Sequence, residues 1–418
     1  MLNRLKRLIP YRFLPRLIYH RLKGKYYAKK ATYPAKKMVV IGVTGTDGKT
    51  TTSQMIFHCL KYADKKAGML TTTTFAWNDH FETNETHKTS LSPKALNHYL
   101  KKFQTHGVEY LVLESSSHAL DQGRLAGIPI HTAVITNLSH EHLDYHLTME
   151  KYREAKAVLF QKSRFGVVNG DDPFLEPLTH MSTESLTFGI ENTNDIYYTD
   201  LTTNTHGLEA TIHFHGQRYH IAIPMFGEYN ILNAIACISA CTTVGLTVDQ
   251  CVAALSAFHG VPGRMEKVEL GTDYTVLIDY TITPQAYRIA LSAVKKIDSG
   301  RLIAVFGACG DRDQAKRPII GKITSELCDV VIVTDDEPYF EDPQQIREMI
   351  VNGVEQKNKD KVTVIDDRRE AIKHALKIAK PHDIIMIMGM GNETSRVIGN
   401  KTLPWSEREI IKTEALLI

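Results

Sequence analysis

The segment "MVVIGVTGTDGKTTT" (residues 38–52) joins an apolar run to a glycine-rich turn and then to a helical pattern over residues 49–62. This order predicts a buried strand, a turn and a helix, the unit from which α/β sheets are built. Gly45 and Gly48 allow the turn to curl so that successive backbone N–H groups point to one side. Because such N–H groups at a helix N-terminus bind anions, the segment predicts a phosphate-binding loop.

The last residues of the turn indicate what kind of phosphate it binds. Lys49 would supply a positive charge to the β- and γ-phosphates of a nucleotide, and the Thr50 hydroxyl suits a Mg²⁺ ion. Val43 stands where the usual spacing of this motif has its first glycine. The strand, the glycine turn, Lys-Thr and the helix together still predict a nucleotide bound with magnesium.

Apolar runs and helical patterns alternate along most of the remaining chain, which predicts parallel sheets with right-handed crossovers. Around the loop the expected strands are "KMVVIGV", "EYLVLES" and "HTAVITN", with helices near 93–106, 148–160, 229–243 and 248–257 and a small β insertion near 185–223. A second series follows "VPGRME" (261–266), with strands "YTVLIDY", "RLIAVFGA", "DVVIVTD", "KVTVIDD" and "DIIMIMG" and helices near 284–297, 315–326, 342–355 and 368–379. We therefore expect an α/β protein with a central phosphate-loop domain at 37–261, whose mostly parallel sheet carries the β insertion, and a Rossmann-like, doubly wound C-terminal domain at 262–418.

Length and cysteine usage agree with this organisation. A chain of 418 residues is long enough for two or three domains. No Cys-x-x-Cys pair occurs among its six cysteines, so we expect neither a disulfide framework nor a zinc ribbon, and a reducing cytoplasm fits best. No apolar run reaches the roughly 18 residues that a membrane span requires.

Residues 1–36 differ in character from the rest of the chain. Arginines and lysines alternate there with large apolar residues, and the first acidic residue of the chain is Asp47. Pro10 and Pro15 predict that the segment divides into short helical pieces. It either lies on an anionic membrane surface, where each cation adds about 1 kcal/mol, or packs its apolar side on the following domain with its cations in water.

Polar residues follow two of the expected strands at the sheet edge where α/β proteins bind ligands. "LESSSHALDQGRL" (113–125) begins with the carboxylate of Glu114, and "TNLSHEHLDYH" (136–146) is rich in histidine. Mg²⁺ prefers oxygen ligands and phosphates prefer cations. The two segments together therefore predict a shared ligand site beside the loop.

Eight motifs of the chain, in order and at approximate spacing, resemble those of the Mur ligases. They are "GVTGTDGKTTT", "ESSSHALDQGRL", "TNLSHEHLDYH", "YREAKAVLF", "GEYNILNAIA", "PGRMEKV", "FGACGDRDQAKRPIIG" and "EDPQQI", and the resemblance extends from residue 38 to about 410. Within the family the chain is most similar to the UDP-N-acetylmuramoyl-tripeptide synthetases, which add the third residue of the peptidoglycan stem peptide.

The resemblance implies an ADP-forming ligase of peptidoglycan precursor synthesis, and hence of cell-wall growth, shape and division. The acceptor's carboxylate would attack the γ-phosphate of ATP, and an amino acid's amine would then displace phosphate from the acyl phosphate. Closure of the two domains around the reactants is expected. The implied partners are small molecules, namely ATP, an amino acid and a muramoyl-peptide acceptor, with Mg²⁺ as cofactor, no nucleic acid, and possible contact of residues 1–30 with a membrane. The protein is expected to be a cytoplasmic monomer.

The resemblance also implies roles for individual residues. Catalysis would rest on Lys49, Glu114, His142 and Lys156, with Lys156 matching a carbamylated lysine, and the metal would be held by Thr50, Glu114, His142 and Lys156. ATP would contact Gly45, Thr46, Asp47, Gly48, Lys49, Thr50, Thr51, Asn169, Asp171, Asn230, Arg264 and Asp279. The acceptor would contact Thr89, Ser90, Ser117, Gln122 and Arg124, and the amino acid would contact Asp336, Glu337, Tyr339, Gly389 and Glu393.

The chain departs from the family pattern near the nucleotide and in the amino-acid site. "DYTITP" (279–284) has Ile282 where the family has histidine. Diaminopimelate-adding members carry Asp-Asn-Pro-Arg where this chain has "DEPY" (336–339), and Gly-Lys-Gly-His-Glu where it has "GMGNE" (389–393). Tyrosine cannot clasp a second carboxylate as arginine does, so meso-diaminopimelate is disfavoured. The acids at 335–337 either suit a cationic side chain, such as that of lysine or ornithine, or are only solvated.

The separate N-terminal domain with which the family binds UDP is also missing from the expected organisation, because about 36 residues cannot bury a core. The acceptor is then held without that domain, or its uridine binds elsewhere, or it is not a UDP-sugar. Two alternative functions remain at this point. One is a ligase similar to folylpolyglutamate synthase, and the other is a non-catalytic, nucleotide-binding scaffold of wall synthesis.

Overall fold

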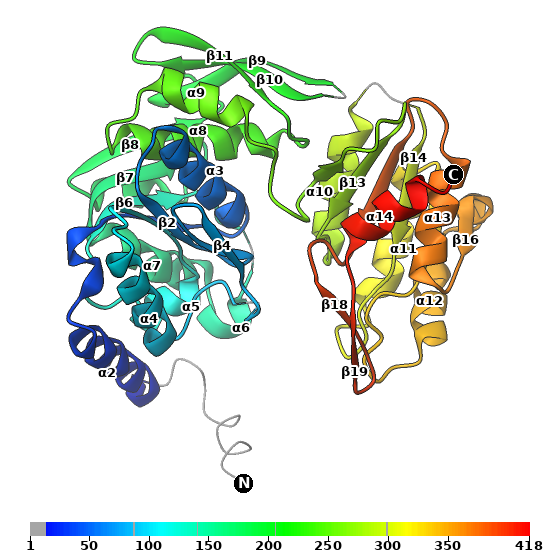
Figure 1. The fold of residues 1–418 in the computed structure, drawn as a ribbon, viewed down its shortest axis with the longest axis horizontal. Helices are drawn as coiled ribbons and strands as arrows, with labels where there is room; N and C mark the ends of the chain where they lie inside the picture. Colours follow the sequence, from blue (N-terminus) through cyan, green and yellow to red (C-terminus); the bar gives the residue numbers. More distant parts are fainter. Residues whose placement is uncertain (1–13, 87, 140, 205, 298–299) are drawn as a thin grey trace. The chain divides into compact units, whose positions relative to one another are not determined.

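The computed structural model describes residues 14–418 apart from residues 87, 140, 205 and 298–299. The chain divides into two compact units (Figure 1). The first unit comprises residues up to Leu201 together with Glu209–Ile223 and Tyr229–Phe258. The second comprises Thr202–Leu208, Pro224–Glu228 and His259–Ile418.

The first unit is built on an 11-stranded sheet in the order β11-β10-β9-β8-β7-β6-β1-β5-β2-β3-β4. The central strands from β2 to β9 pair in parallel, and β3 and β4 add an antiparallel edge. The strands are β1 (Val39–Thr44), β2 (Ala67–Leu70), β3 (Thr74–Trp77), β4 (His80–Thr83), β5 (Tyr110–Glu114), β6 (Ile130–Ile135), β7 (Ser163–Asn169), β8 (Glu184–Gly189), β9 (Ile196–Asn204), β10 (Gly207–Phe214) and β11 (Gln217–Ile223).

Helices cover this sheet, and α8 and α9 pack beside α3 (Figure 1). The helices are α2 (Leu14–Lys30), α3 (Lys49–Tyr62), α4 (Pro93–Thr105), α5 (Ser117–Asp121), α6 (Leu143–His146), α7 (Met149–Phe160), α8 (Tyr229–Thr242) and α9 (Val248–Ser256), with 3₁₀ turns η1 (Pro34–Lys37) and η2 (Glu176–His180). The central strands are buried on both faces, which is why they read as continuous apolar runs rather than as alternating patterns.

The second unit has a six-stranded sheet in the order β12-β13-β17-β14-β15-β16, parallel except for the β12–β13 pair. Its elements are β12 (Glu266–Val268), β13 (Thr275–Asp279), α10 (Pro284–Lys295), β14 (Leu302–Phe306), α11 (Lys316–Leu327), β15 (Val330–Val333), α12 (Pro343–Asn352), η3 (Gln356–Lys361), β16 (Val362–Val364), α13 (Arg368–Ile378), β17 (Ile384–Met388), β18 (Ser395–Ile398), β19 (Lys401–Pro404) and α14 (Glu407–Ala415). Strands β18 and β19 form a separate hairpin.

Successive residues of the second sheet enter two different cores. Ala304 and Phe306 belong to one apolar cluster, whereas Ile303 and Val305 belong to the cluster on the other face. Each fully buried aliphatic side chain of this kind stabilises the fold by about 1.5–3 kcal/mol. A parallel sheet with both faces covered is the doubly wound arrangement, so the predicted α/β class with two parallel-sheet regions is confirmed.

Helix α2 corrects one expectation about the N-terminal segment. Residues 14–30 form one continuous helix rather than short pieces, because Pro15 lies in its first turn, where a missing N–H and a fixed φ are tolerated. Pro10 lies outside the described residues. Leu17, Gly24 and Ala28 are buried against the first unit. The opposite face leaves apolar side chains in solvent, with exposures of 47% for Ile18, 60% for Tyr19, 60% for Leu22 and 58% for Tyr26.

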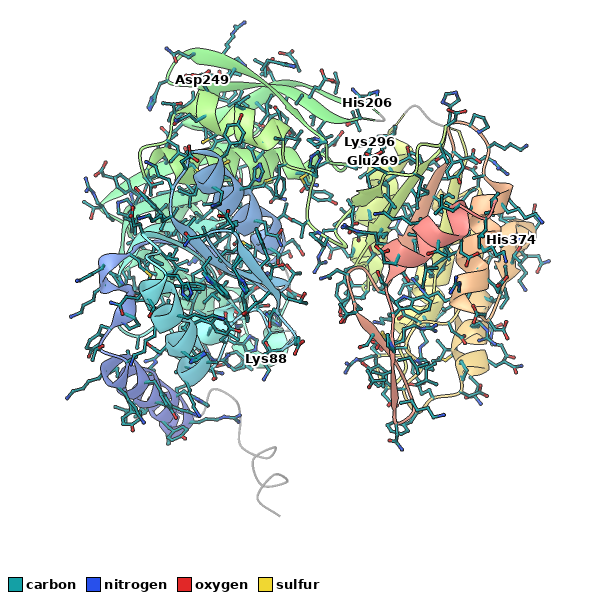
Figure 2. The ribbon with its side chains drawn as sticks, in the orientation of Figure 1. Lys88, His206, Asp249, Glu269, Lys296 and His374 are labelled. Carbon is teal, nitrogen blue, oxygen red and sulfur yellow. The ribbon has the colours of Figure 1, made fainter. Side chains whose placement is uncertain are left out.

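The side chains drawn in Figure 2 show that both units carry polar surfaces, with Lys88 and Asp249 labelled on the first and Glu269, Lys296 and His374 on the second. Among the described residues, no helix is both long and apolar enough to cross a bilayer.

Candidate active site

The glycine turn of residues 45–48 lies between β1 and the N-terminus of α3. Gly45 has φ 149° and Gly48 has φ 77°, a backbone region that favours glycine. A Cβ atom on Gly45 would collide with the Thr136 hydroxyl, and one on Gly48 would collide with the Asn233 amide oxygen. Both glycines are therefore required by conformation and by close neighbours, and the turn stays open toward the start of α3.

We expect Gly48→Ala to destabilise the first unit by about 2–3 kcal/mol, because it combines backbone strain with the Asn233 collision. Gly107→Ala is the matched control, since Gly107 has φ 69° with no atom within 4 Å of the added Cβ. It should cost only the backbone term of about 1 kcal/mol. Denaturant unfolding of both variants measures the difference, and equal losses would contradict the collision.

Residues after β6 hold the loop in place. The Asn137 side-chain oxygen accepts hydrogen bonds from the backbone N–H groups of Thr46 at 3.1 Å and Asp47 at 2.9 Å. The Thr136 hydroxyl donates to the Asp47 carbonyl at 2.5 Å. The segment "TNLSHEHLDYH" thus begins with the two residues that fix the loop, as the carboxyl ends of neighbouring parallel strands meet at one sheet edge.

Lys49 and Thr50 lie at the first turn of α3. The Lys49 ammonium donates to the Thr46 carbonyl at 2.5 Å, so its charge stays beside the loop. The Thr50 hydroxyl donates to Glu114 Oε1 at 3.0 Å. Thr51, the next residue, is buried within the helix.

Glu114 ends β5 and is 1% exposed. Besides the Thr50 hydroxyl, its carboxylate accepts the Thr72 backbone N–H at 2.7 Å and the Thr72 hydroxyl at 2.9 Å. A buried carboxylate beside a hydroxyl, at the mouth of a phosphate loop, supplies the hard oxygen donors that Mg²⁺ prefers. The residues present therefore fit a magnesium ion.

Lys156 projects from α7 toward the same loop and is 1% exposed. Its Nζ donates to the Gly45 carbonyl at 2.7 Å and lies 4.5 Å from the centre of the Tyr152 ring. Burial, and secondarily the charge of Lys49, lowers the pKa of Lys156 well below its usual value. Within the described part of the chain no carboxylate forms an ion pair with it, so burial favours the uncharged amine.

His142 approaches the site from the other side of Tyr152. Its ring lies 6.1 Å from the Tyr152 ring and 5.0 Å from the His118 ring, and its backbone has φ 56°. The Tyr152 hydroxyl is 3.3 Å from the Thr46 hydroxyl of the loop. The structure thus places Lys49 and Lys156 in contact with the loop, and Thr50 in contact with Glu114. His142 is connected to them through Tyr152.

Most of the predicted acceptor residues lie next to Glu114. The Thr89 hydroxyl is within hydrogen-bond distance of the Thr72 hydroxyl, at 3.1 Å, and Thr72 in turn contacts the carboxylate. The Arg124 guanidinium donates to the Ser90 carbonyl at 3.1 Å and to the Gln122 side-chain oxygen at 2.8 Å. Ser117 is bonded to His146 at 2.9 Å.

Arg124 has a feature suited to an anionic acceptor. Its hydrogen bonds go to neutral oxygens, and among the described residues no carboxylate is within ion-pair distance of it. Burial lowers the pKa of its guanidinium. A partly buried cation with only neutral partners favours the approach of a carboxylate or phosphate.

The other predicted ATP residues of the first unit divide into two groups. Asn230 is buried and accepts a 2.9 Å hydrogen bond from Asn233, the residue that touches Gly48, so it lies behind the loop. Asn169 donates to the Thr136 carbonyl at 3.2 Å. Asp171 instead closes a local turn, accepting from the Ile190 backbone at 2.6 Å and from two further N–H groups.

Arg264 and Asp279, also assigned to ATP, belong to the second unit. The Arg264 guanidinium lies 4.9 Å from the Tyr280 ring and donates to the Tyr280 carbonyl at 3.3 Å. The buried Asp279 carboxylate accepts from the Met265 N–H at 2.7 Å and from the Thr281 hydroxyl. Burial raises the pKa of Asp279. The substituted position Ile282 is 38% exposed.

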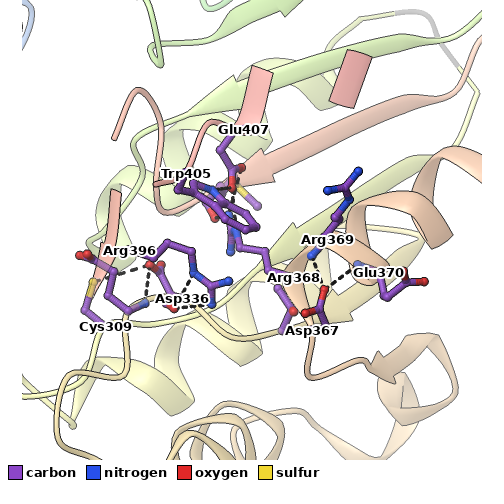
Figure 3. A network of polar contacts seen from close by, with 12 residues as sticks. Cys309, Asp336, Asp367, Arg368, Arg369, Glu370, Arg396, Trp405 and Glu407 are labelled. Carbon is purple, nitrogen blue, oxygen red and sulfur yellow. Dashed lines mark hydrogen bonds and ion pairs between the residues drawn. The ribbon is translucent and has the colours of Figure 1, made fainter. Parts of the chain in front are cut away.

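Three of the predicted amino-acid residues, Asp336, Glu337 and Tyr339, lie in the loop after β15, and Figure 3 shows Asp336 with Arg396 beside it. Asp336 is 4% exposed, and burial raises the pKa of its carboxyl group. Arg396 donates to the Asp336 carbonyl at 2.8 Å. The Glu337 carboxylate accepts from the Tyr339 hydroxyl at 3.3 Å, and burial raises its pKa as well. Asp335 pairs with Arg347, so the three acids are not simply solvated.

The last two predicted amino-acid residues, Gly389 and Glu393, come from the segment "GMGNE" (389–393). A Cβ on Gly389, whose φ is 114°, would collide with the Asp336 carboxylate, so the "GMGNE" segment lies directly against that acid. Glu393 follows in a turn, with its N–H donating to the Met390 carbonyl at 3.0 Å. Behind Asp336, the fully buried Arg368 pairs with Glu407 at 2.7 Å and donates to the Met388 carbonyl at 2.8 Å (Figure 3).

Several residues of the site were missed by sequence reasoning. Thr72 and Asn233 contact Glu114 and Gly48 respectively, and Tyr152 lies between Lys156 and His142. Asn137 and Asn233 belong to the motifs "TNLSHEHLDYH" and "GEYNILNAIA", so a role for their amide side chains beside the loop could have been predicted. Thr72 stands in a run of threonines with no such signal.

A phosphate loop with oxygen ligands at the carboxyl edge of a parallel sheet, followed by a second parallel-sheet unit, defines a nucleotide-dependent α/β enzyme. The chain matches the Mur ligase middle domain over residues 43–241 and the "Mur ligase, glutamate ligase domain" over residues 263–391. It belongs to the Mur ligase family, whose members are ATP-dependent, ADP-forming ligases of peptidoglycan synthesis. The predicted family is confirmed.

Its relatives include tripeptide-forming enzymes. The UDP-N-acetylmuramoyl-L-alanyl-D-glutamate–2,6-diaminopimelate ligase 1 of Clostridium acetobutylicum is 35% identical, over 90% of this chain and 78% of the relative. The UDP-N-acetylmuramyl-tripeptide synthetase of Roseiflexus sp. is 35% identical, over 90% of this chain and 78% of the relative. A solved structure of a UDP-N-acetylmuramoyl-L-alanyl-D-glutamate–2,6-diaminopimelate ligase shares 31% identity with this chain at a TM-score of 0.73, covering 95% of this chain and 82% of the solved one. The folylpolyglutamate synthase of Mycobacterium tuberculosis shares the fold, with a TM-score of 0.67 at 18% identity over 88% and 92%.

Proposed function

We propose that this chain adds an amino acid to the terminal carboxylate of a muramoyl-peptide acceptor, at the expense of ATP. The observation that carries the proposal is a continuous series of hydrogen bonds, from Thr50 through Glu114 and Thr72 to Thr89. It links the phosphate loop to the residues assigned to the acceptor. An acceptor carboxylate held there lies next to the nucleotide's phosphates, as phosphoryl transfer requires.

The reaction has two steps. The acceptor carboxylate attacks the γ-phosphorus, forming an acyl phosphate while ADP leaves. The amino acid's uncharged amine then attacks the acyl carbon, phosphate leaves with the electron pair of the broken C–O bond, and the nitrogen gives up one proton, which the phosphate takes up. Lys49 stabilises the phosphate charge, Arg124 orients the acceptor, and Asn169, Asn230, Arg264 and Asp279 are assigned to the nucleotide. Thr50, Glu114 and His142 would hold Mg²⁺, which neutralises phosphate charge when bound.

We also propose that Lys156 is carbamylated. Its amine is buried and pairs with no carboxylate in the described part of the chain, and burial lowers its pKa, which favours the nucleophilic free base. Attack of Nζ on CO₂ forms an N–C bond and releases one proton, leaving a carbamate with two oxygen atoms. These oxygens would add a fourth metal-holding group beside the loop, of the hard type that Mg²⁺ prefers.

The incoming amino acid is proposed to carry a cationic side chain without a second carboxylate. Asp336 and Glu337 offer negative charge, whereas Tyr339 stands where an arginine would bind a second carboxylate. With UDP-muramoyl dipeptide as acceptor, we expect lysine or ornithine to give at least about tenfold more phosphate release than meso-diaminopimelate, the ratio that 1.4 kcal/mol of selectivity produces. A preference for meso-diaminopimelate would overturn this assignment.

The same assay tests the reaction class. Phosphate release that depends on folate and glutamate, and not on a muramoyl peptide, would show a folylpolyglutamate-type ligase. ATP binding without amino-acid-dependent ADP release for any acceptor would show a nucleotide-binding scaffold.

Helix α2 is proposed to contact an anionic membrane surface. Ile18, Leu22 and Tyr26 follow one another at intervals of four residues on its exposed face, and Arg21, Lys25 and Lys29 lie beside them. We expect Leu22→Glu to weaken binding to anionic vesicles at least about tenfold, since it removes an exposed apolar side chain that would enter the membrane surface and adds a repelled charge. Lys94→Glu, an exposed charge change on α4, is the control, and vesicle sedimentation is the measurement. Equal binding by all three proteins would contradict the proposal.

A further inference from the structure

Four cysteines that are scattered in the sequence gather in the interior of the first unit. Cys59 comes from α3, Cys237 and Cys241 from α8, and Cys251 from α9. All four are at most 1% exposed. The sulfur of Cys59 lies 3.7 Å from that of Cys237, which lies 4.0 Å from that of Cys241. In the described part of the chain, these three sulfurs form the one group of potential metal ligands that all lie within 4.8 Å of one another.

The helices explain why the sulfurs meet. Cys237 and Cys241 are four residues apart, so they point to the same face of α8. Helix α3 packs against that face and supplies Cys59, and α9 packs against both helices. Helix α9 begins with a complete capping box between Thr247 and Gln250, with Asp249 in its first turn (Figure 2), which fixes the start of the helix that carries Cys251.

The spacing of the sulfurs suits one tetrahedral metal ion. Zinc–sulfur bonds are about 2.3 Å long, so two thiolates on one zinc ion lie about 3.8 Å apart. The observed separations of 3.7 and 4.0 Å match that value. We propose that Cys59, Cys237, Cys241 and Cys251 together bind one Zn²⁺ ion as thiolates.

Cys251 is proposed as the fourth ligand of the site. Its carbonyl oxygen lies 3.9 Å from the Cys59 sulfur, so its backbone adjoins the group of three sulfurs, and rotation about its χ1 angle would turn its own sulfur toward the ion. Zinc binding releases the remaining thiol protons to solvent. A set of four sulfur ligands favours zinc or an iron–sulfur cluster, but sulfurs this close together leave room for a single ion and not for several iron and sulfide atoms.

The site would connect the fold to the phosphate loop. Helix α3 begins with Lys49 and Thr50, and α8 carries Asn233, which accepts a 3.3 Å hydrogen bond from Thr52 and touches Gly48. An ion joining Cys59, about three turns after Lys49 on α3, to Cys237, about one turn after Asn233 on α8, would keep Asn233 in register with the loop. This consequence rests on the proposed function, whereas zinc binding itself does not.

The test is the zinc content of the full chain, expressed with zinc and purified under reducing conditions. We expect one zinc per chain, release of that zinc by a thiol-modifying mercurial, and thiolate-to-cobalt charge-transfer absorption after exchange with Co²⁺. Cys241→Ser should lose the zinc, whereas the control Cys328→Ser, equally buried but in the second unit, should retain it.

A Cys241→Ser variant that does not fold would leave the wild-type measurements to decide. A protein in which all six cysteines titrate as free thiols and no metal is bound, both as purified and after zinc addition to the reduced protein, would overturn the proposal. Iron with acid-labile sulfide, or a disulfide between Cys59 and Cys237, would also overturn it. Because no ATP or acceptor is present, failure here is independent of the ligase assay.

Discussion

Lys156→Ala is expected to reduce amino-acid-dependent ADP release by about 10²–10³-fold, the usual effect of removing one preorganised electrostatic contact from a transition state. The variant loses the buried amine that is proposed to become a carbamate beside the phosphate loop. Short carboxylic acids such as acetate should restore part of the activity, because they can occupy the vacated space and return an oxygen ligand. Initial rates with and without acetate are the measurement.

Lys151→Ala is the matched control, since Lys151 lies on the same helix but is exposed. It should keep wild-type activity. A carbamate carbon signal in ¹³C NMR after growth or exchange with ¹³C-bicarbonate should be present in the wild type and in Lys151→Ala, and absent from Lys156→Ala. Near-normal activity of Lys156→Ala would remove this residue from the reaction, and loss of activity without rescue would indicate that its amine, not a carbamate, is needed.

The burial of Lys156 could have been predicted from the spacing of apolar residues in the sequence. Tyr152, Ala155, Leu159 and Phe160 form the buried face of α7, and Lys156 stands at the helical spacing that belongs to the same face. A lysine in the middle of an apolar face requires an explanation, because a buried ammonium group is costly. Without the family, residue type alone would have placed it in solvent.

Other features depend on pairings between distant residues that no local pattern contains. Asp171 lies in "VNGDD" beside the nucleotide residues, but its carboxylate is occupied by backbone N–H groups near Ile190. The cysteines at 59, 237 and 251 meet because α3, α8 and α9 pack together, although no motif spacing connects them. The strands were predictable because burial on both faces requires a continuous run of apolar residues. The turn was predictable because a positive φ favours glycine.

The acidic segment after β15 is a further place where the sequence alone does not predict burial. "TDDEP" reads as a solvated turn, yet Asp336 is buried, Asp335 pairs with Arg347, and Glu337 accepts a 3.0 Å hydrogen bond from the Val397 backbone. Its partners come from α12 and from the β18–β19 hairpin, which follow later in the chain. The resemblance indicated that this segment belongs to a site, whereas the tertiary structure supplies the groups that allow its charges to be buried.

Glu114→Gln is expected to lower the rate of ADP release by about 10²–10³-fold and to raise the Mg²⁺ concentration needed for half-maximal rate by at least about tenfold. The amide keeps the size of the carboxylate but loses its negative charge, and its NH₂ group opposes the Thr72 N–H that now donates to Oε2 at 2.7 Å. Glu109→Gln is the control, since Glu109 precedes the same strand and its side chain pairs with Lys66 at the surface. Rates measured across a magnesium series at saturating ATP separate metal affinity from the chemical step. A Glu114→Gln protein that folds, loses rate and keeps the wild-type magnesium midpoint would place the ion elsewhere, because a carboxylate that holds the metal cannot lose its charge without changing that midpoint.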